Sequence, residues 1–137
     1  MHKISRRKFV HQTTKTAFAT VITAGAIVNT QAMSDNSTFI HHVYFWLNNP
    51  ESKEDFEQLV AGLRKLSAVK TIKTFYIGKP ADTNRDVIDR SYSVSWLLLF
   101  NNKADQDSYQ TDPIHLKFVD ECKHLWKKVV VYDTVNV

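Results

Sequence analysis

The stretch Phe-Ile-His-His-Val-Tyr-Phe-Trp-Leu at residues 39–47 decides how the rest of the sequence is interpreted. It is rich in β-branched and aromatic residues and is too short for a good helix, so it predicts a β-strand. Both faces of this strand have apolar residues. The face of His41 has Phe39, Val43, Phe45 and Leu47, and the face of His42 has Ile40, Tyr44 and Trp46. A strand that is apolar on both faces is usually covered on both faces.

The segments that follow alternate between helical and strand periodicity. The pattern predicts a helix over residues 51–68, strands over 69–78 and 92–100, helices over 103–110 and 113–128, and a final strand over 129–135. Asp112 followed by Pro113 is typical of a helix start, because Asp caps the first turn and Pro suits the first helical position. The polar residues 81–91 predict a loop. We therefore expect one α+β domain.

The predicted order β-α-β-β-α-β is typical of the ferredoxin-like fold, which is a four-stranded antiparallel sheet with its helices on one face. Such helices leave the other face of the sheet uncovered, although its residues are also apolar. The simplest cover is a second copy of the chain. We therefore expect a homodimer that packs sheet to sheet.

The charge of the chain is unevenly distributed. The formal net charge is +4, from 18 basic and 14 acidic residues among 137. Five of the basic residues and none of the acidic ones fall in residues 1–32, which leaves 13 against 14, or a net charge of −1, in the rest. The basic excess therefore does not indicate a nucleic-acid partner. The single cysteine, Cys122, excludes an internal disulfide bond.

Residues 1–32 have the layout of an export signal, with a basic start, an apolar stretch and a small residue, Ala32, at the expected cleavage point. The apolar stretch over residues 17–28 has about 12 residues, which is too short to span a bilayer as a helix. We therefore expect no permanent membrane anchor after the signal is removed.

Arg6 and Arg7 lie within Ser-Arg-Arg-Lys-Phe-Val, which resembles a twin-arginine export motif. The resemblance implies a bacterial protein that is exported by the twin-arginine machinery and is periplasmic or secreted. The expected organisation is this signal peptide, a short polar segment over residues 33–38, and a single domain over residues 39–137.

Histidine is the residue type best suited to acid–base chemistry here, because imidazole titrates near neutral pH. His41 and His42 are adjacent on a strand, so their side chains point to opposite faces and cannot bind one metal ion together. His115 and His124 are nine residues apart on the predicted helix and also diverge. We therefore expect no metal site, and no motif in the sequence indicates a cofactor.

His42 and His115 are the candidate catalytic pair. If the strand face that has His42 meets the helices, both imidazoles approach one interior layer, where Tyr109 can add a phenol. Such a group suits acid–base catalysis. The same three residues also suit a purely structural cluster in which every polar group has a hydrogen-bond partner. The further candidate binding residues are aromatic, and they are Tyr44, Trp46, Trp96 and Phe118.

Four segments together form a recognisable pattern. They are His42-Val43-Tyr44-Phe45-Trp46-Leu47, then Gly78, then Tyr109-x-x-Asp112-Pro113-x-His115-x-x-Phe118, and then Trp126-x-x-Val129-Val130-Val131-Tyr132-Asp133. This pattern resembles the stress-responsive A/B barrel domain, a family of dimeric α/β barrels, over about residues 38–135. The resemblance implies a homodimer whose two sheets form a barrel with the helices outside.

The family includes a plant polyketide cyclase, and the resemblance implies that its acid–base His matches His115, its active-site Tyr matches Tyr109 and its strand His matches His42. The residue before the proline departs from that cyclase, which has His where this chain has Asp112. Two functions follow. One is a small-molecule-binding module without turnover. The other is a cofactor-independent cyclase, lyase or isomerase that acts on a carbonyl compound, with His115 as base, Tyr109 as proton donor or oxyanion partner and His42 as positioner.

Overall fold

The computed structural model describes residues 38–137. The predicted export signal, with Arg6, Arg7 and Ala32, lies outside the described residues. Within the described part of the chain, no helix is long and apolar enough to cross a membrane.

The described residues form four strands, three α-helices and a short 3-10 turn. In chain order these are β1 (Phe39–Leu47), α1 (Lys53–Leu66), β2 (Thr74–Gly78), β3 (Val94–Phe100), α2 (Lys103–Thr111), α3 (Pro113–Cys122), η1 (Lys123–Leu125) and β4 (Trp126–Thr134). Helices α2 and α3 are consecutive and together occupy the position of the second helix in the predicted order.

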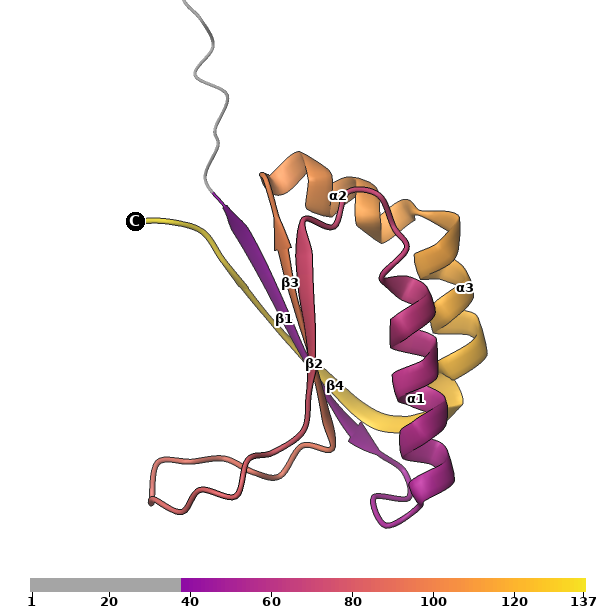
Figure 1. The fold of residues 1–137 in the computed structure, drawn as a ribbon, viewed down its shortest axis with the longest axis vertical. Helices are drawn as coiled ribbons and strands as arrows, with labels where there is room; N and C mark the ends of the chain where they lie inside the picture. The colour runs from indigo at the N-terminus through magenta and orange to yellow at the C-terminus, as the bar shows by residue number, and fades with distance from the viewer. Residues whose placement is uncertain (1–37) are drawn as a thin grey trace, which may run out of the picture. The chain divides into compact units, whose positions relative to one another are not determined.

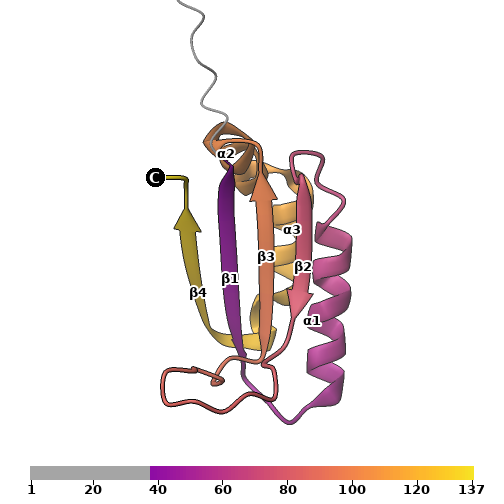
Figure 2. The ribbon, with the colours of Figure 1, turned by 60° about the vertical axis from the view of Figure 1, so that its left-hand side comes forward.

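The strands form one antiparallel sheet in the order β2-β3-β1-β4. All three helices lie on one side of this sheet, and the other side is open (Figures 1 and 2). The ferredoxin-like prediction is therefore confirmed. The two faces of the sheet are called the helix-covered face and the open face below.

Side-chain caps fix where the helices begin. The Ser52 hydroxyl accepts a hydrogen bond from the Asp55 amide at the start of α1. The Asn102 side chain accepts one from the Asp105 amide at the start of α2. Asp112 ends α2 and also caps α3, because its carboxylate accepts a bond from the Ile114 amide while Pro113 begins the helix. This junction breaks the helical direction and sets the position of the residues on either side.

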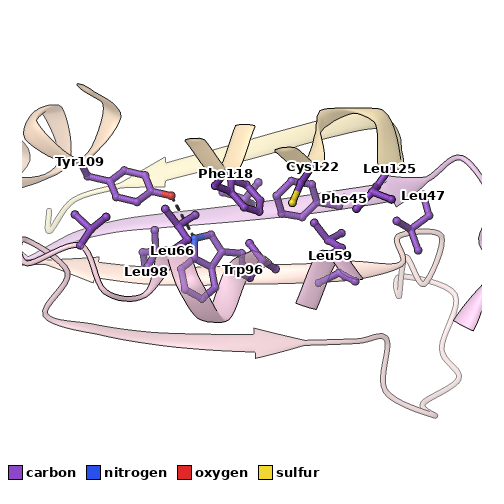
Figure 3. Packing of buried hydrophobic residues seen from close by; sticks show 14 of the residues in the cluster. Phe45, Leu47, Leu59, Leu66, Trp96, Leu98, Tyr109, Phe118, Cys122 and Leu125 are labelled. Atoms are coloured by element: carbon purple, nitrogen blue, oxygen red, sulfur yellow. Dashed lines mark hydrogen bonds between the residues drawn. The ribbon is translucent and has the colours of Figure 1, made fainter. Parts of the chain in front are cut away.

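The core lies between the sheet and the helices. In β1 every second side chain is buried, from Phe39 to Leu47. The side chains that meet them come from β3 and from the helices, among them Leu59, Leu66, Trp96, Leu98, Phe118 and Cys122 (Figure 3). Cys122 is buried among apolar side chains, and burial is the main cause that raises its thiol pKa, so it acts as a core residue.

Two predicted boundaries were wrong. Strand β2 begins at Thr74 and not at residue 69, because the chain turns after α1 and Val69 is buried in that turn with 2% of its surface exposed. Helix α3 ends at Cys122 and β4 begins at Trp126, so Trp126 is a strand residue and not a helical one. In both places an apolar residue that packs in or against the core continued a periodic pattern beyond the end of the element.

Candidate functional site

A hollow of about 350 Å³ opens between the helix-covered face and helices α2 and α3. We call it the helix-side hollow. Most of its lining is apolar, and the residues are His41, Val43, Phe45, Trp96, Tyr109, Gln110, His115, Phe118, Val119, Lys123, Trp126, Val129 and Val131. Its volume falls within the range that is usual for small-molecule sites.

Three polar rings lie together in this lining, and Tyr109 is the middle one. Its ring centroid is 4.5 Å from that of His115 and 5.9 Å from that of His41. Tyr109 comes from the end of α2, His115 from the first turn of α3, and His41 from β1. The Asp112–Pro113 break between the two helices is therefore what brings the phenol beside the imidazole of His115.

His41 is held in place by a hydrogen bond to a residue of the neighbouring strand. Its Nδ1 lies 2.6 Å from a carboxylate oxygen of Asp133, its register partner in β4. The His41 side chain is 5% exposed, whereas 45% of the Asp133 side chain is exposed. A carboxylate can only accept here, so Nδ1 of His41 has the proton, and Nε2 of the neutral ring has a free lone pair.

His115 has the same tautomer for a different reason. Its Nδ1 lies 3.1 Å from the backbone carbonyl oxygen of Gln110, which can only accept a hydrogen bond. Nε2 of the neutral imidazole is therefore unprotonated. Burial lowers the pKa of His115 below its ordinary value, and the nearby His41 lowers it further, while the Gln110 carbonyl and Asp112 oppose the shift. The ring is therefore mostly neutral at pH 7 and is able to accept a proton.

Tyr109 is suited to donate rather than to accept a proton. It is 1% exposed, and burial raises the pKa of its phenol to about 12. Nε1 of Trp96 donates a hydrogen bond of 3.4 Å to the phenol oxygen (Figure 3). The phenol's own proton is thus available to another acceptor, such as a carbonyl oxygen in the hollow.

The prediction that His42 joins His115 and Tyr109 was wrong about the face of the strand. His42 lies on the open face, where the Tyr44 hydroxyl is 3.1 Å from its Nδ1. The physical reason is that the helices pack against the strand face whose large side chains have no polar atoms. His41 belongs to that face. His41 is therefore the site residue that the sequence analysis missed. The lower hydropathy of Tyr44 and Trp46, which share the face of His42, was the available signal.

The four predicted binding residues separate in the same way. Trp96 and Phe118 line the helix-side hollow with Tyr109 and His115. Tyr44 and Trp46 lie on the open face and contribute to a different hollow. Within residues 38–137, no three His, Cys, Asp or Glu side chains come together in a way that could hold a metal ion.

The sequence of residues 39–136 matches the family described as the Stress responsive A/B Barrel Domain. The chain belongs to this family. No curated protein matches the chain.

Solved structures of A/B barrel proteins and other ferredoxin-like proteins have the same fold at low sequence identity. A protein of this family from Mesorhizobium loti is 22% identical with a TM-score of 0.62, over 74% of this chain and 98% of that one. A dimeric ferredoxin-like protein of unknown function from Thermobifida fusca is 16% identical with a TM-score of 0.61, over 74% and 93%. The hydroxynitrile lyase of Passiflora edulis is 21% identical with a TM-score of 0.62, over 74% and 95%. These similarities establish the fold.

Proposed function

We propose that this A/B barrel protein binds a small, largely apolar compound that has a carbonyl group. The observation that supports the proposal is the phenol of Tyr109 between two imidazoles in the lining of the helix-side hollow. The apolar walls suit the body of such a compound, and the free phenol proton suits its carbonyl oxygen. The ligand's apolar part would lie against Phe45, Phe118 and Trp126.

Calorimetric titration with benzaldehyde and with toluene tests this binding. The two compounds have similar shapes, but only benzaldehyde has a hydrogen-bond acceptor. We expect Tyr109→Phe to weaken benzaldehyde binding about fivefold, because one hydrogen bond contributes about 1 kcal/mol, and to leave toluene binding unchanged. Equal affinity of the native protein for both compounds would contradict a carbonyl-directed site.

A second candidate function is acid–base catalysis, and the tautomers of the two histidines favour it. Both place Nδ1–H on a protein acceptor and leave Nε2 free. In a lyase reaction on a cyanohydrin, Nε2 of His115 would take the hydroxyl proton as the bond to the cyano carbon breaks. Tyr109 would donate a hydrogen bond to the oxygen that becomes the carbonyl. The departing cyanide would then take the proton from His115 and leave as hydrogen cyanide.

The Passiflora edulis protein is a hydroxynitrile lyase, and its resemblance to this chain establishes only a shared fold. The test is release of benzaldehyde from mandelonitrile by the native protein, compared with His115→Ala. We expect the variant to lose at least 100-fold in turnover while its melting temperature stays close to that of the native protein. If the variant mainly lowers the melting temperature, the three rings are a structural cluster.

The homodimer is the second part of the proposal. The open face has exposed or half-buried apolar side chains in a continuous register, such as Leu97 beside His42 and Leu99 beside Ile40. Similar structures from other organisms are described as dimeric. Sedimentation equilibrium of the protein is expected to give twice the chain mass. A monomer at high micromolar concentration would contradict the sheet-to-sheet dimer.

Export is the third part, and it rests on the sequence of residues 1–32. We propose that the twin-arginine machinery exports the folded domain, which is then periplasmic or secreted. Cell fractionation should find the native protein outside the cytoplasm. Replacement of Arg6 and Arg7 by Lys should keep the protein in the cytoplasm with its signal attached. Export of this variant as efficiently as of the native protein would contradict the twin-arginine route.

A further inference from the structure

The helix-side hollow differs in charge from one end to the other, and the proposed function uses only one of its ends. Tyr109 and His115 line the end that is formed by α2 and the first turn of α3. Lys123, at the C-cap position of α3, also lines the hollow. It is the only Lys, Arg, Asp or Glu among the described residues of this lining. The hollow therefore has one place where a ligand meets a permanent positive charge.

Lys123 lies at the opposite end of the hollow from the polar rings. At a rise of about 1.5 Å per residue, His115 and Lys123 are about 12 Å apart along the axis of α3. Phe118 lies between Tyr109 and Leu125 (Figure 3). Leu125 and Lys123 belong to the same short turn, η1. A ligand that reaches both ends is therefore elongated, and its middle part passes aromatic side chains.

The wall between the two ends is apolar and partly open to solvent. Val119 of α3 and Val129 and Val131 of β4 line the hollow and are exposed. A hydrocarbon chain that lies along them removes this apolar surface from water, which is favourable. The proposed dimer packs on the open face, on the other side of the sheet, so it does not cover this wall. The middle of the ligand is therefore expected to be a hydrocarbon chain.

The ammonium group of Lys123 is able to bind an anion. Its contact in the protein is with Asp120 in the preceding turn of α3, at 3.3 Å. Both side chains are exposed, and an ion pair between exposed side chains contributes little to stability. A lysine side chain is also long and flexible. Nζ of Lys123 can therefore exchange Asp120 for an anionic group of a ligand in the hollow.

The end of the hollow with the polar rings disfavours an anion. The carboxylate of Asp133 lies there, 2.6 Å from Nδ1 of His41. Asp112 is also near, because its charge is one of the contributions that oppose the effect of burial on the pKa of His115. Like charges repel, so an anionic group of a ligand is expected to lie away from these two carboxylates. The charges thus orient a ligand that has one anionic end.

We propose that the ligand of the helix-side hollow is an oxo acid of medium chain length, whose carbonyl oxygen accepts the hydrogen bond of Tyr109 and whose carboxylate pairs with Nζ of Lys123. This inference rests on the proposed carbonyl-binding function and adds the second end of the ligand. One ammonium group matches one monovalent carboxylate, whereas a phosphate dianion would keep an uncompensated negative charge. Lys123 is thus the residue that distinguishes acidic from neutral carbonyl compounds.

Calorimetric titration of the full chain with 8-oxononanoate and with its methyl ester tests the proposal. The two compounds have the same carbonyl group and the same chain, but only the acid has a charge at its far end. We expect the acid to bind about fivefold to tenfold more tightly at low salt, and this advantage to shrink at high ionic strength. 4-Oxopentanoate is too short to reach both ends and should have no advantage over its own methyl ester.

Variants of charged residues locate the carboxylate. Lys123→Gln is expected to abolish the preference for the acid and to leave binding of the ester unchanged, which also shows that the variant is folded. Lys117→Gln is the matched control and should keep the preference. Lys117 forms a similar exposed ion pair in the same helix, with Glu121, but does not line this hollow. Asp120→Asn removes the competing carboxylate and should raise the preference about twofold.

The possible results separate the oxo-acid ligand from the carbonyl-binding function. If acid and ester bind equally well and Tyr109→Phe weakens both, the carbonyl site stands and the carboxylate site is wrong. If neither compound binds, the carbonyl-binding function is wrong and the oxo-acid proposal is wrong with it. If Lys123→Gln retains the preference for the acid, the carboxylate binds elsewhere and the assignment to Lys123 is overturned.

Discussion

His41 and His42 are neighbours in β1, and the difference between them is the difference between the two faces of the sheet. His41 is 4% exposed, pairs with Asp133 and faces a hollow with Tyr109 and His115. His42 is half-buried on the open face, with Tyr44 as its partner. The helix-covered face meets an apolar core that also contains the rings of His41, Tyr109 and His115. The open face is a wide aromatic surface whose polar atoms reach water or a partner.

The comparison shows that the neighbours of an imidazole, and not burial alone, decide what it can do in this protein. Burial lowers the pKa of both His42 and His115. Only His115 combines that shift with a fixed tautomer and a buried phenol beside it. The same chemical group is therefore a candidate base on one side of the sheet and a half-buried residue of the open face on the other.

The largest expected difference between the faces is in core packing. Leu98 is fully buried and Leu97, its neighbour in β3, is half-buried on the open face. We expect Leu98→Ala to lower the free energy of unfolding by about 2–5 kcal/mol, because the residual cavity cannot collapse. Leu97→Ala should cost less than half as much in urea unfolding of the monomer. Leu97→Ala should instead weaken self-association, as measured by sedimentation. Equal losses of unfolding free energy in the two variants would mean that the two faces are equally buried.

The paired histidines give the next effect. His41→Ala removes a buried ring and its bond to Asp133, and we expect a loss of about 1–3 kcal/mol in unfolding free energy together with loss of benzaldehyde binding. His42→Ala should leave benzaldehyde binding unchanged and cost less than about 1 kcal/mol, because its ring is partly exposed. If His42→Ala alone abolished that binding, the helix-side hollow would not be the site.

The hydroxyl groups of Tyr109 and Tyr44 offer a smaller and cleaner test. Tyr109→Phe leaves Nε1 of Trp96 without its acceptor in the core, and we expect a cost of about 1–2 kcal/mol. Tyr44→Phe removes a bond to His42 that water can replace, so its cost should be within about 0.5 kcal/mol. Thermal unfolding of the two variants side by side gives both values.

The smallest expected effect is a pH dependence of stability. The pKa of His115 is lower in the folded than in the unfolded protein, so the unfolded state binds a proton first as the pH falls. The contribution of the neutral ring to stability is therefore complete above the ordinary histidine pKa of about 6.5 and is lost as the pH falls towards the folded value. His115→Gln should flatten the decline of melting temperature below pH 6.5, and an unchanged decline would contradict the assignment.

Much of the fold was predictable because its signals are local. The strand at residues 39–47, the Ser52 cap and the Asp112–Pro113 helix start all depend on neighbours within a few residues. The sequence also predicted that Tyr109 and His115 lie near each other, and their ring centroids are 4.5 Å apart. The ends of β2 and α3 were less predictable, because Val69 and Trp126 are apolar residues beyond the element to which periodicity assigned them.

The amino-acid sequence by itself determined the element order, the antiparallel sheet, the surplus of apolar residues on both strand faces and the basic N-terminal segment. These follow from periodicity, capping and composition, which act over short distances along the chain. Only the tertiary structure decided which face of β1 meets the helices. That choice depends on how β3, α2 and α3 pack against β1. Because successive side chains of a strand point to opposite faces, the opposite choice would place His42 under the helices in place of His41. The same packing decided that the candidate acid–base group is His41, Tyr109 and His115.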